Sequence, residues 1–333
     1  MRAIAISSYS TPSGYELRDL PKPELRREND VIIKVHAASV NPVDVKLASG
    51  QMKMVFQSLF PSPIGFDCAG TVVEIGSEVT RFKVGDEDCA ALKPSSISFG
   101  DAASLPLAAV TAIQALRKYD GDLSGKTVFI PAGLSGTGAY ACQLAKNVFK
   151  AGKVITTVST AKVPKVAELL GDNVVDEIID YKESDPATAI PAKSVDFLFD
   201  TVGVAMEYLP LVRQDGWVIS ISTMPSGSQL QEWDIMHLPH NPTVPAYVRI
   251  PLNLLDRMKR LKAQRYGAHY EYMFLTPSGE DLDSLRAWVE EGKVRPVVGT
   301  VADFHDIDAI RRVCQVVYDG QGGLGKVVIS MVE

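Results

Sequence analysis

The sequence predicts a two-domain α/β protein, in which a β-rich domain is followed by a Rossmann-type, doubly wound parallel sheet. Three observations predict it. The first hundred residues hold short β-rich runs that Gly and Pro interrupt, such as residues 30–40 and 70–76. Beyond residue 126, apolar runs alternate with helical patterns, which is typical of a parallel sheet covered on both faces. The chain of 333 residues also exceeds the ~100–200 residues of one typical domain.

Six short apolar runs are the expected strands of the parallel sheet. They are residues 126–130, 153–158, 176–181, 195–200, 216–222 and 270–275. Between the first two runs, Ala141, Leu144, Ala145 and Val148 have the spacing of one helix face. A further helix ends at Gly171, a residue that favours the C-terminal cap conformation. Strands and helices therefore alternate as in a doubly wound fold.

The remaining segments place the domain boundaries. Residues 103–116 are almost wholly apolar and predict a buried helix at a domain junction. After residue 276 we expect two amphipathic helices and a strand at 326–330. The apolar face of the first helix is Leu282, Leu285 and Val289, and that of the second is Ile307, Ile310, Cys314 and Val317. We therefore assign residues 1–107 and 276–333 to the first domain and residues 108–275 to the second.

Composition excludes several classes of function. A net charge of −6 and a pI near 5.5 argue against nucleic-acid binding. No basic run reaches five residues, so an anchor to an anionic membrane is not expected, and no apolar run reaches the ~18 residues of a membrane span. The N-terminus lacks the apolar core of a signal peptide. The four cysteines lie far apart, and we expect them to be buried and inert. The prediction is a soluble, cytoplasmic protein, either a monomer or a homodimer.

Residues 130–146, IPAGLSGTGAYACQLAK, lie between the first strand of the parallel sheet and its helix. The dinucleotide fingerprint G-x-G-x-x-G here becomes Gly133, Ser135 and Gly138. The free N–H groups and partial positive charge of a helix N-terminus suit a pyrophosphate. Ser135 is either tolerated because it is small or supplies its own hydrogen bond. The alternative is an ordinary strand–loop–helix turn, and the strand context favours cofactor binding.

The end of the second strand favours NADPH over NADH. An NAD-preferring site carries a carboxylate about 20 residues beyond the loop, and Ser159, Thr160 and Lys162 occupy that region here. Two hydroxyls and a cation suit a 2′-phosphate, which needs donors and positive charge. The alternative for Lys162 is an ordinary solvated lysine, which is our preferred interpretation of Lys165.

Several motifs together resemble one enzyme family. They are SVNPVDVKLASG (39–50), PIGFDCAGTVVEIGSEVTRFKVGDE (63–87), AASLPLAAVTA (102–112), VDFLFDTVG (195–203) and GKVVIS (325–330). In this order they resemble the medium-chain dehydrogenases/reductases, and more closely the zinc-independent quinone oxidoreductase and enoyl reductase branch (the zeta-crystallin-like group). The resemblance implies a GroES-like catalytic domain for the β-rich part and a Rossmann domain that binds NADPH.

The resemblance also addresses metal binding. Zinc-dependent members of the family carry a cysteine ligand three residues before an aspartate, and another ligand in a GHE motif. Here Asn41 precedes Asp44, and Phe66 stands within GFD. Because a tetrahedral site cannot be assembled without thiolate or imidazole ligands at these positions, we expect no metal ion.

Hydride transfer without a metal is the chemistry that remains. NADPH supplies hydride to the β-carbon of an enone or enoyl thioester, or to a quinone, and the resulting oxyanion needs hydrogen-bond donors. The resemblance implies that Asn41 and Thr111 lie beside the nicotinamide and that Lys46 faces the acceptor. The cofactor contacts that we expect are Gly133, Ser135, Gly136, Thr137, Gly138, Ser159, Thr160, Lys162, Tyr181, Gly203, Gly325 and Lys326.

Some of these residues have a second interpretation. Lys46 stands where many quinone reductases have tyrosine; it polarises the acceptor oxygen or relays a proton, or it is an exposed lysine. Gly325 and Lys326 contact the cofactor or form a turn before a strand. We interpret Asp44 as structural, tying the loop after Asn41 by hydrogen bonds.

Two segments complete the prediction. Residues 223–250 are expected to be a loop that lines the substrate cleft, with Trp233 and Met236 as apolar wall. Residues 83–107 join almost directly two parts that about thirty more residues separate in the family. We expect either a truncated, more open site, which admits bulky acceptors or catalyses weakly, or a flexible loop that is absent from this sequence. Two alternatives to an NADPH-dependent reductase of quinones or activated C=C bonds remain open. One is a trans-acting enoyl reductase that partners a polyketide synthase, and the other is a low-activity NADPH-binding regulatory protein.

Overall fold

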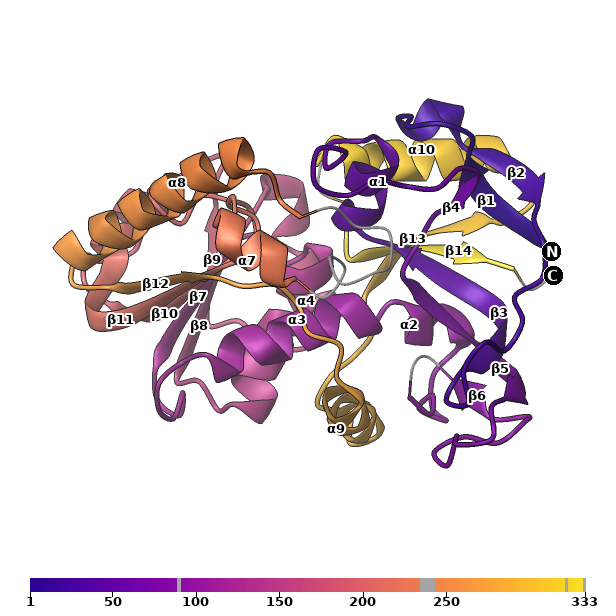
Figure 1. Cartoon of the computed structure of the whole chain (residues 1–333). Helices are drawn as coiled ribbons and strands as arrows, with labels where there is room; N and C mark the ends of the chain where they lie inside the picture. Colours follow the sequence, from indigo (N-terminus) through magenta and orange to yellow (C-terminus); the bar gives the residue numbers. More distant parts are fainter. Residues whose placement is uncertain (89–90, 234–242, 321–322, 332–333) are drawn as a thin grey trace. The chain divides into compact units, whose positions relative to one another are not determined.

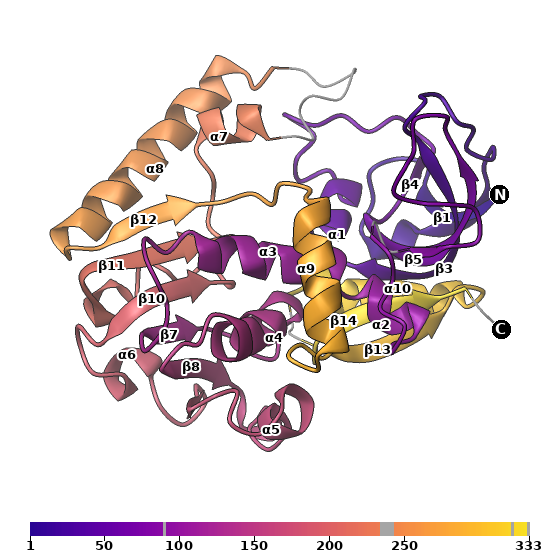
Figure 2. The same cartoon turned by 90° about the horizontal axis from the view of Figure 1, so that it is seen from below.

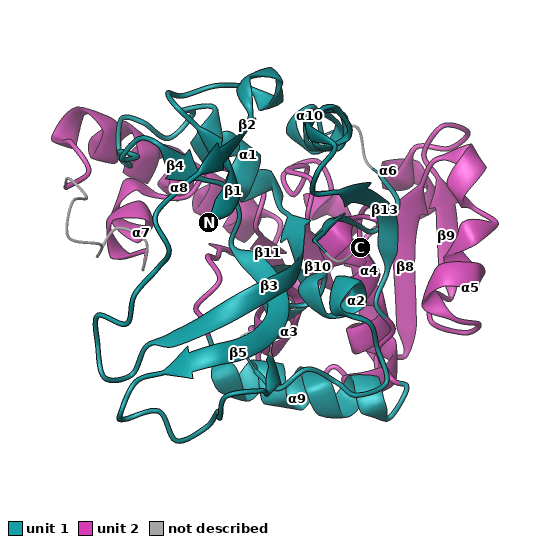
Figure 3. Ribbon diagram, turned by 90° about the vertical axis from the view of Figure 1, so that its right-hand side faces the viewer, with its two compact units in different colours: residues 1–110, 278–292, 296–333 teal, residues 111–277, 293–295 magenta. Residues whose placement is uncertain are grey.

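The computed structural model describes residues 1–88, 91–233, 243–320 and 323–331. The chain divides into two compact units, which Figure 3 colours separately. The first unit comprises residues 1–110, 278–292 and 296–333, and the second comprises residues 111–277 and 293–295. The division predicted from the sequence, after residues 107 and 275, differs from this one by a few residues.

The second unit contains a six-stranded sheet in the order β12-β11-β10-β7-β8-β9, and every neighbouring pair is parallel. Its strands are β7 (Thr127–Ile130), β8 (Lys153–Val158), β9 (Glu177–Asp180), β10 (Val195–Asp200), β11 (Val212–Ser220) and β12 (His269–Tyr272). The predicted doubly wound sheet is therefore confirmed. The strand order reverses at β7, beside β10, so that the carboxyl ends of β7, β8 and β10 are neighbours at one edge of the sheet.

Helices cover both faces of this sheet. Their bounds are α3 (Pro106–Arg117), α4 (Gly136–Gln143), α5 (Lys165–Leu170), α6 (Pro186–Ala189), α7 (Gly227–Glu232) and α8 (Ala246–Arg265). Figure 1 shows α8 on one side of strands β10 to β12 and α3 on the other. The buried core includes Phe129, Leu198, Val218 and Tyr270 from the strands and Ala263 from α8. Continuous β-branched and aromatic runs form these strands because both of their faces are covered.

One prediction for this unit is corrected. Residues 223–250 are not a single loop, because α7 occupies Gly227–Glu232 and α8 begins at Ala246. The helix was missed because Pro245 and Pro251 flank its first turns, and an internal proline removes a helical N–H donor. Pro251 lies inside α8 on its exposed face. Met236 lies outside the described residues.

The first unit contains two sheets, visible beside helices α9 and α10 in Figure 2. A five-stranded sheet has the order β13-β14-β3-β5-β6, and a three-stranded sheet has the order β2-β1-β4. The strands are β1 (Arg2–Ile6), β2 (Glu16–Asp19), β3 (Val31–Val40), β4 (Ser62–Pro63), β5 (Asp67–Ile75), β6 (Glu87–Asp88), β13 (Val298–Asp303) and β14 (Lys326–Ser330). All pairs are antiparallel except β13 with β14, as expected for a β-rich domain.

The described part of the first unit also contains the helices α1 (Pro42–Ala48), α2 (Phe99–Ala103), α9 (Gly279–Glu290) and α10 (Ile307–Tyr318). The predicted apolar face of α10 is buried at Ile310 and Cys314, which pack with Tyr15 and Val45. Burial raises the pKa of the Cys314 thiol to about 12, so this cysteine is inert at neutral pH. Among the described residues, no helix combines the length and the apolarity that crossing a bilayer requires.

Candidate functional site

The glycine loop joins the end of β7 to the start of α4. Ser135 is the N-cap of α4, and its hydroxyl oxygen accepts a hydrogen bond from the Gly138 N–H at 3.1 Å. The serine therefore replaces the middle glycine of the fingerprint with a capping side chain, which satisfies one of the unpaired N–H groups at the helix start. The Ser135 hydroxyl group also has one proton that it can donate.

The two glycines that match the fingerprint, Gly133 and Gly138, are required for steric reasons. A Cβ on Gly133 would lie 2.1 Å from Thr156 Oγ1, and a Cβ on Gly138 would lie 2.3 Å from the Ala132 carbonyl oxygen. Both distances are shorter than van der Waals contact. The loop is further fixed where the Ala132 N–H donates to Thr157 Oγ1 at 3.0 Å. The sequence-predicted turn is thus a tight one, held against β8.

The residues predicted to bind the 2′-phosphate lie at the neighbouring strand ends. Because β7, β8 and β9 are adjacent and parallel, their carboxyl ends bring the glycine loop, Ser159 and Tyr181 to one edge of the sheet. Ser159 precedes a single helical turn, Thr160–Lys162. Lys162 is partly buried, and desolvation lowers the pKa of its ammonium group. Tyr181 is half exposed, with the Lys182 ammonium 5.5 Å from its ring centroid.

Asp200, at the end of β10, organises the next loop and was not singled out by the sequence analysis. Its carboxylate accepts hydrogen bonds from the Gly203 N–H at 2.8 Å and from the Ser220 hydroxyl at 2.8 Å. It also accepts from the N–H groups of residues 202, 204 and 205. Gly203 has φ = 93°, a conformation that glycine adopts readily. Asp200 therefore fixes the loop that carries Gly203 beside the glycine loop.

In the first unit, Asp67 lies at the centre of a buried polar cluster. Its Oδ2 atom accepts from Ser39 Oγ at 3.1 Å, from Asn41 Nδ2 at 2.9 Å and from Lys326 Nζ at 3.3 Å. Its Oδ1 atom accepts from the Leu107 N–H at 3.0 Å. Lys326 Nζ also donates to Asn41 Oδ1. The predicted site residues Asn41 and Lys326 are thus in direct contact, and both are nearly fully buried.

Asp44 extends this cluster along α1. Its Oδ2 atom accepts from the Asn41 N–H at 2.7 Å, so Asp44 has the structural role that we expect, but it ties the start of helix α1 and not a loop. Its Oδ1 atom is buried without a partner among the described residues. Burial, with the nearby Asp67 charge, raises the pKa of the Asp44 carboxyl to about 7, and the Asn41 N–H and Lys326 oppose the rise. Lys46, on the same helix, is exposed.

The donor set in this cluster does not fit zinc. Asn41 Oδ1 and Asp67 Oδ2 already bind the ammonium group of Lys326, and a divalent cation there would be repelled by that charge. The side chain of Phe66 is 54% exposed and offers no ligand atom. Within the described ranges, no three His, Cys, Asp or Glu side chains are grouped so that they could hold a metal ion.

Gly325, another predicted site residue of the first unit, directly precedes β14 and has φ = 60°. Thr111 and Trp233 lie in the second unit. Thr111 is buried on α3. Trp233 stacks on Phe274, with ring centroids 4.5 Å apart and an interplanar angle of 9°. These two rings line a cavity of about 530 Å³, together with residues of α3 and the end of β12. The wall of this cavity also carries the ion pair Lys118–Glu271, at 2.9 Å.

Comparisons with known proteins agree with this arrangement. Residues 27–103 match the alcohol dehydrogenase GroES-like domain, and residues 175–329 match the zinc-binding dehydrogenase domain. The chain is 31% identical to a mitochondrial NAD(P)H oxidoreductase of Bos taurus, over 86% of this chain and 78% of that protein. It is 30% identical to the 2-methylene-furan-3-one reductase of Solanum lycopersicum, over 91% of this chain and 73% of that protein.

A solved structure shows the same fold. The quinone oxidoreductase from Coxiella burnetii superimposes with a TM-score of 0.78, at 28% identity, over 99% of both chains. A GroES-like unit and a Rossmann unit with a glycine loop define a nicotinamide-dependent oxidoreductase. The chain belongs to the medium-chain dehydrogenase/reductase family, in its quinone oxidoreductase-like branch.

Proposed function

We propose that this oxidoreductase transfers hydride from NADPH, without zinc, to a quinone or to an electron-poor C=C bond of an enone or enoyl thioester. The observation that carries the proposal is the Asn41–Asp67–Lys326 cluster. The ammonium group of Lys326 binds Asn41 Oδ1 and Asp67 Oδ2, the oxygen atoms that would otherwise be available to a zinc ion. The names of the relatives support the acceptor class: one is a 2-methylene-furan-3-one reductase and another is an alkenal/one oxidoreductase.

The preference for NADPH rests on the end of β8. Ser159 and Thr160 offer hydroxyl groups, Lys162 offers a cation, and no carboxylate stands in that turn to repel a 2′-phosphate. A 2′-phosphate is bound most strongly by charge-assisted hydrogen bonds. Tyr181 and Lys182, at the end of the neighbouring β9, add an aromatic face and a second cation.

The residues of the chain would act as follows in this reaction. The bound cofactor supplies hydride. The N-terminus of α4, with the Ser135 hydroxyl, would hold the pyrophosphate, and Asp200 fixes the loop of Gly203. The acceptor oxygen gains negative charge as hydride arrives and needs donors.

Asn41 and Lys46 are the donors that we propose for that oxygen. An amide nitrogen has two protons. Asp67 accepts one of them from Asn41, and we propose that the acceptor oxygen takes the other when it binds. Lys46 is exposed on the helix that Asn41 begins, and its ammonium group is a second donor. Buried Lys326 and Asp67 position Asn41 through its amide group.

Binding and turnover test the proposal separately. NADPH and NADH are titrated against the protein by fluorescence, and NADPH oxidation is then followed with a panel of quinones and enones. We expect tighter binding of NADPH and turnover with at least one acceptor class. Tight NADPH binding without turnover on any acceptor would support the regulatory alternative instead, and equal affinity for NADH would remove the role of Ser159, Thr160 and Lys162.

A further inference from the structure

Helix α8 exposes a continuous apolar stripe, which we call the α8 stripe. Its members share large apolar side chains with high exposure: Tyr247 (70%), Ile250 (65%), Leu254 (58%), Met258 (58%) and Leu261 (48%). They are separated by three or four residues, the spacing that places side chains on one face of a helix. Single exposed apolar residues are ordinary, but a contiguous patch marks an interaction surface.

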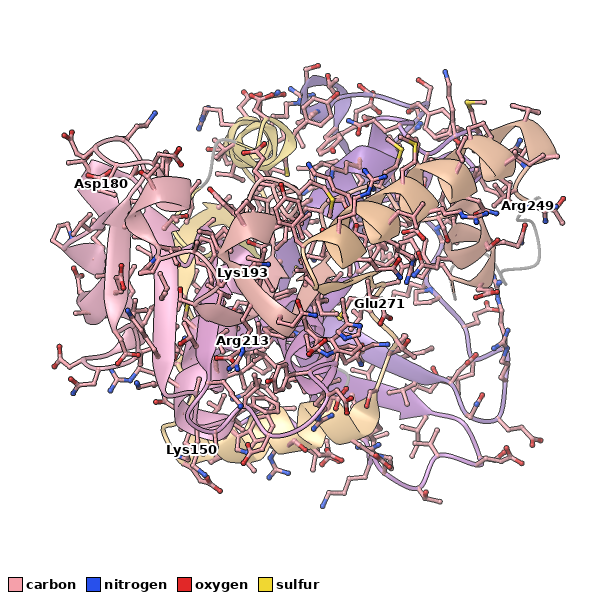
Figure 4. The ribbon with its side chains drawn as sticks, turned by 90° about the vertical axis from the view of Figure 1, so that its left-hand side faces the viewer. Lys150, Asp180, Lys193, Arg213, Arg249 and Glu271 are labelled. Atoms are coloured by element: carbon pink, nitrogen blue, oxygen red, sulfur yellow. The ribbon has the colours of Figure 1, made fainter. Side chains whose placement is uncertain are left out.

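The stripe faces away from the body of the second unit. The opposite side of α8 is buried at Asp256 and Ala263, and Ala263 packs in the core of the unit. Figure 1 shows α8 on the outside of the sheet, and Figure 4 shows its side chains, with Arg249 labelled near its N-terminal end. At a rise of about 1.5 Å per residue, the stripe from Tyr247 to Leu261 is about 21 Å long.

Positive charge borders the stripe on both sides, at Arg257 and Lys262. The helix carries the cations Arg249, Arg257, Lys259, Arg260, Lys262 and Arg265 and a single acid, Asp256. Lys259 is used within the protein, where its Nζ atom donates to the Met224 carbonyl oxygen at 2.7 Å. Asp256 is used within the protein, where its Oδ2 atom binds Arg260 Nε at 2.7 Å. In the part of the chain that the structure describes, Arg257, Lys262 and Arg265 have no carboxylate partner. A chain with a net charge of −6 therefore carries one strongly basic helix.

We propose that α8 docks the protein on an anionic bilayer surface. An apolar stripe between rows of Lys and Arg is the arrangement of helices that lie in the membrane interface, where apolar side chains enter the acyl boundary and cations meet lipid phosphates. A second copy of this chain is the less suitable occupant, because its α8 offers the same cations and no free carboxylate. Peripheral docking needs no membrane-spanning helix.

The prediction from the sequence that the protein has no membrane contact does not take this surface into account. That prediction rests on the absence of a run of five consecutive basic residues. The cations of α8 are instead distributed among apolar residues, and only the helical turn brings Arg257 and Lys262 to the two borders of the stripe. Membrane docking is independent of the proposed reaction, since neither the stripe nor its cations belong to the cofactor or hydride sites.

Vesicle sedimentation of the full chain tests the proposal. The probes are phosphatidylcholine vesicles with and without about 30% phosphatidylserine. We expect binding to the anionic vesicles, little binding to the neutral ones, and weaker binding as salt screens the charges. The variant R257Q/K262Q should lose roughly fivefold in affinity for each charge removed. The variant L254Q/M258Q should lose about tenfold or more, because two apolar anchors are gone.

A matched control separates the α8 stripe from exposed apolar residues in general. Leu59 and Met54 are 69% and 55% exposed outside α8, so M54Q/L59Q makes the same chemical exchange and should bind the vesicles as the wild type does. No binding to anionic vesicles, or equal loss in M54Q/L59Q and L254Q/M258Q, would overturn the proposal. A dimer in sedimentation velocity that L254Q/M258Q abolishes would assign the stripe to a second copy, and binding to polyglutamate but not to vesicles would assign it to an acidic protein.

Discussion

The glycine-loop edge of the second unit and the buried cluster of the first unit both gather polar groups, but they satisfy them differently. At the glycine loop, the Ser135 oxygen takes the Gly138 N–H and leaves other N–H groups of the helix start for an anion. In the cluster, Asp67, Asn41 and Lys326 satisfy one another almost completely. The first arrangement is open to a ligand, whereas the second holds charge inside the protein and positions a single amide.

The largest effect is expected from breaking the buried ion pair. Lys326 and Asp67 are 4% and 5% exposed, so Lys326→Met leaves the Asp67 carboxylate buried without its cation. Loss of one partner of such a pair costs about 3–5 kcal/mol, which chemical denaturation measures as a lower free energy of unfolding.

Two variants control this experiment. Lys46→Met makes the same exchange at an exposed position and should change the free energy of unfolding by no more than about 0.5 kcal/mol. The double variant D67N/K326M removes both charges and should recover part of the loss. If K326M had the same free energy of unfolding as K46M, the ion pair of Lys326 and Asp67 would not contribute to the stability of the protein.

Asp44 gives the cluster a dependence on pH. Its folded pKa of about 7 lies above its ordinary value of 3.8, so the folded state favours the protonated carboxyl. Its contribution to stability is therefore complete below about pH 4 and is lost as the pH rises through 7. At about 1.36 kcal/mol for each pKa unit, the loss reaches up to about 4 kcal/mol.

Comparing the wild type with Asp44→Asn isolates the contribution of the Asp44 carboxyl to the free energy of unfolding. The amide oxygen of the variant can still accept a hydrogen bond from the Asn41 N–H, but the amide group does not titrate. The free energy of unfolding of the wild type, less that of D44N, should fall between pH 4 and pH 7. A difference that stays level or increases over this range would contradict the assignment.

A smaller effect, on cofactor affinity, is expected at the glycine-loop edge of the second unit. Lys162→Ala should weaken NADPH binding by about 1.5–3 kcal/mol, the contribution of a hydrogen bond to a charged group, and should leave NADH binding unchanged. Fluorescence titration with both cofactors measures it. Lys165→Ala, three residues along the same segment, is the matched control and should bind both cofactors normally. Equal losses for the two cofactors in K162A would mean that Lys162 does not face the 2′-phosphate.

The smallest effect concerns Ser135. Replacing an N-cap serine by alanine costs about 0.5–2 kcal/mol of stability. Ser278 caps α9 through the same 3.1 Å bond, to the Asp281 N–H, so S278A should cost a comparable amount. If the Ser135 hydroxyl also holds the pyrophosphate, S135A alone should weaken NADPH and NADH equally. Unchanged affinity for both cofactors in S135A would limit the residue to capping.

Local patterns made the Rossmann unit predictable, because each of its signals lies within a short stretch of sequence. The strand before Gly133 and the helix after it are adjacent in the chain, and so are the hydroxyls and cation at the end of β8. The cluster of the first unit gives no such signal, since Asp67 and Lys326 are 259 residues apart. Asp200 was missed because an aspartate at a strand end has no pattern of its own.

Helix α8 was missed for a further reason. A helix is normally recognised by an apolar face directed to the core, whereas the large apolar residues of α8, such as Leu254 and Met258, are directed outward. Its buried face includes Asp256. The sequence pattern therefore contains the stripe, but not the information that this stripe is exposed.

Hydride transfer by metal-free protein tests the central claim most directly. The protein is purified in the presence of a chelator, shown by elemental analysis to contain no zinc, and supplied with NADPH and an enone or quinone acceptor. The account predicts that NADPH is oxidised at the same rate as before chelation and that added zinc does not increase the rate. Activity that disappears on chelation and returns with zinc would contradict it.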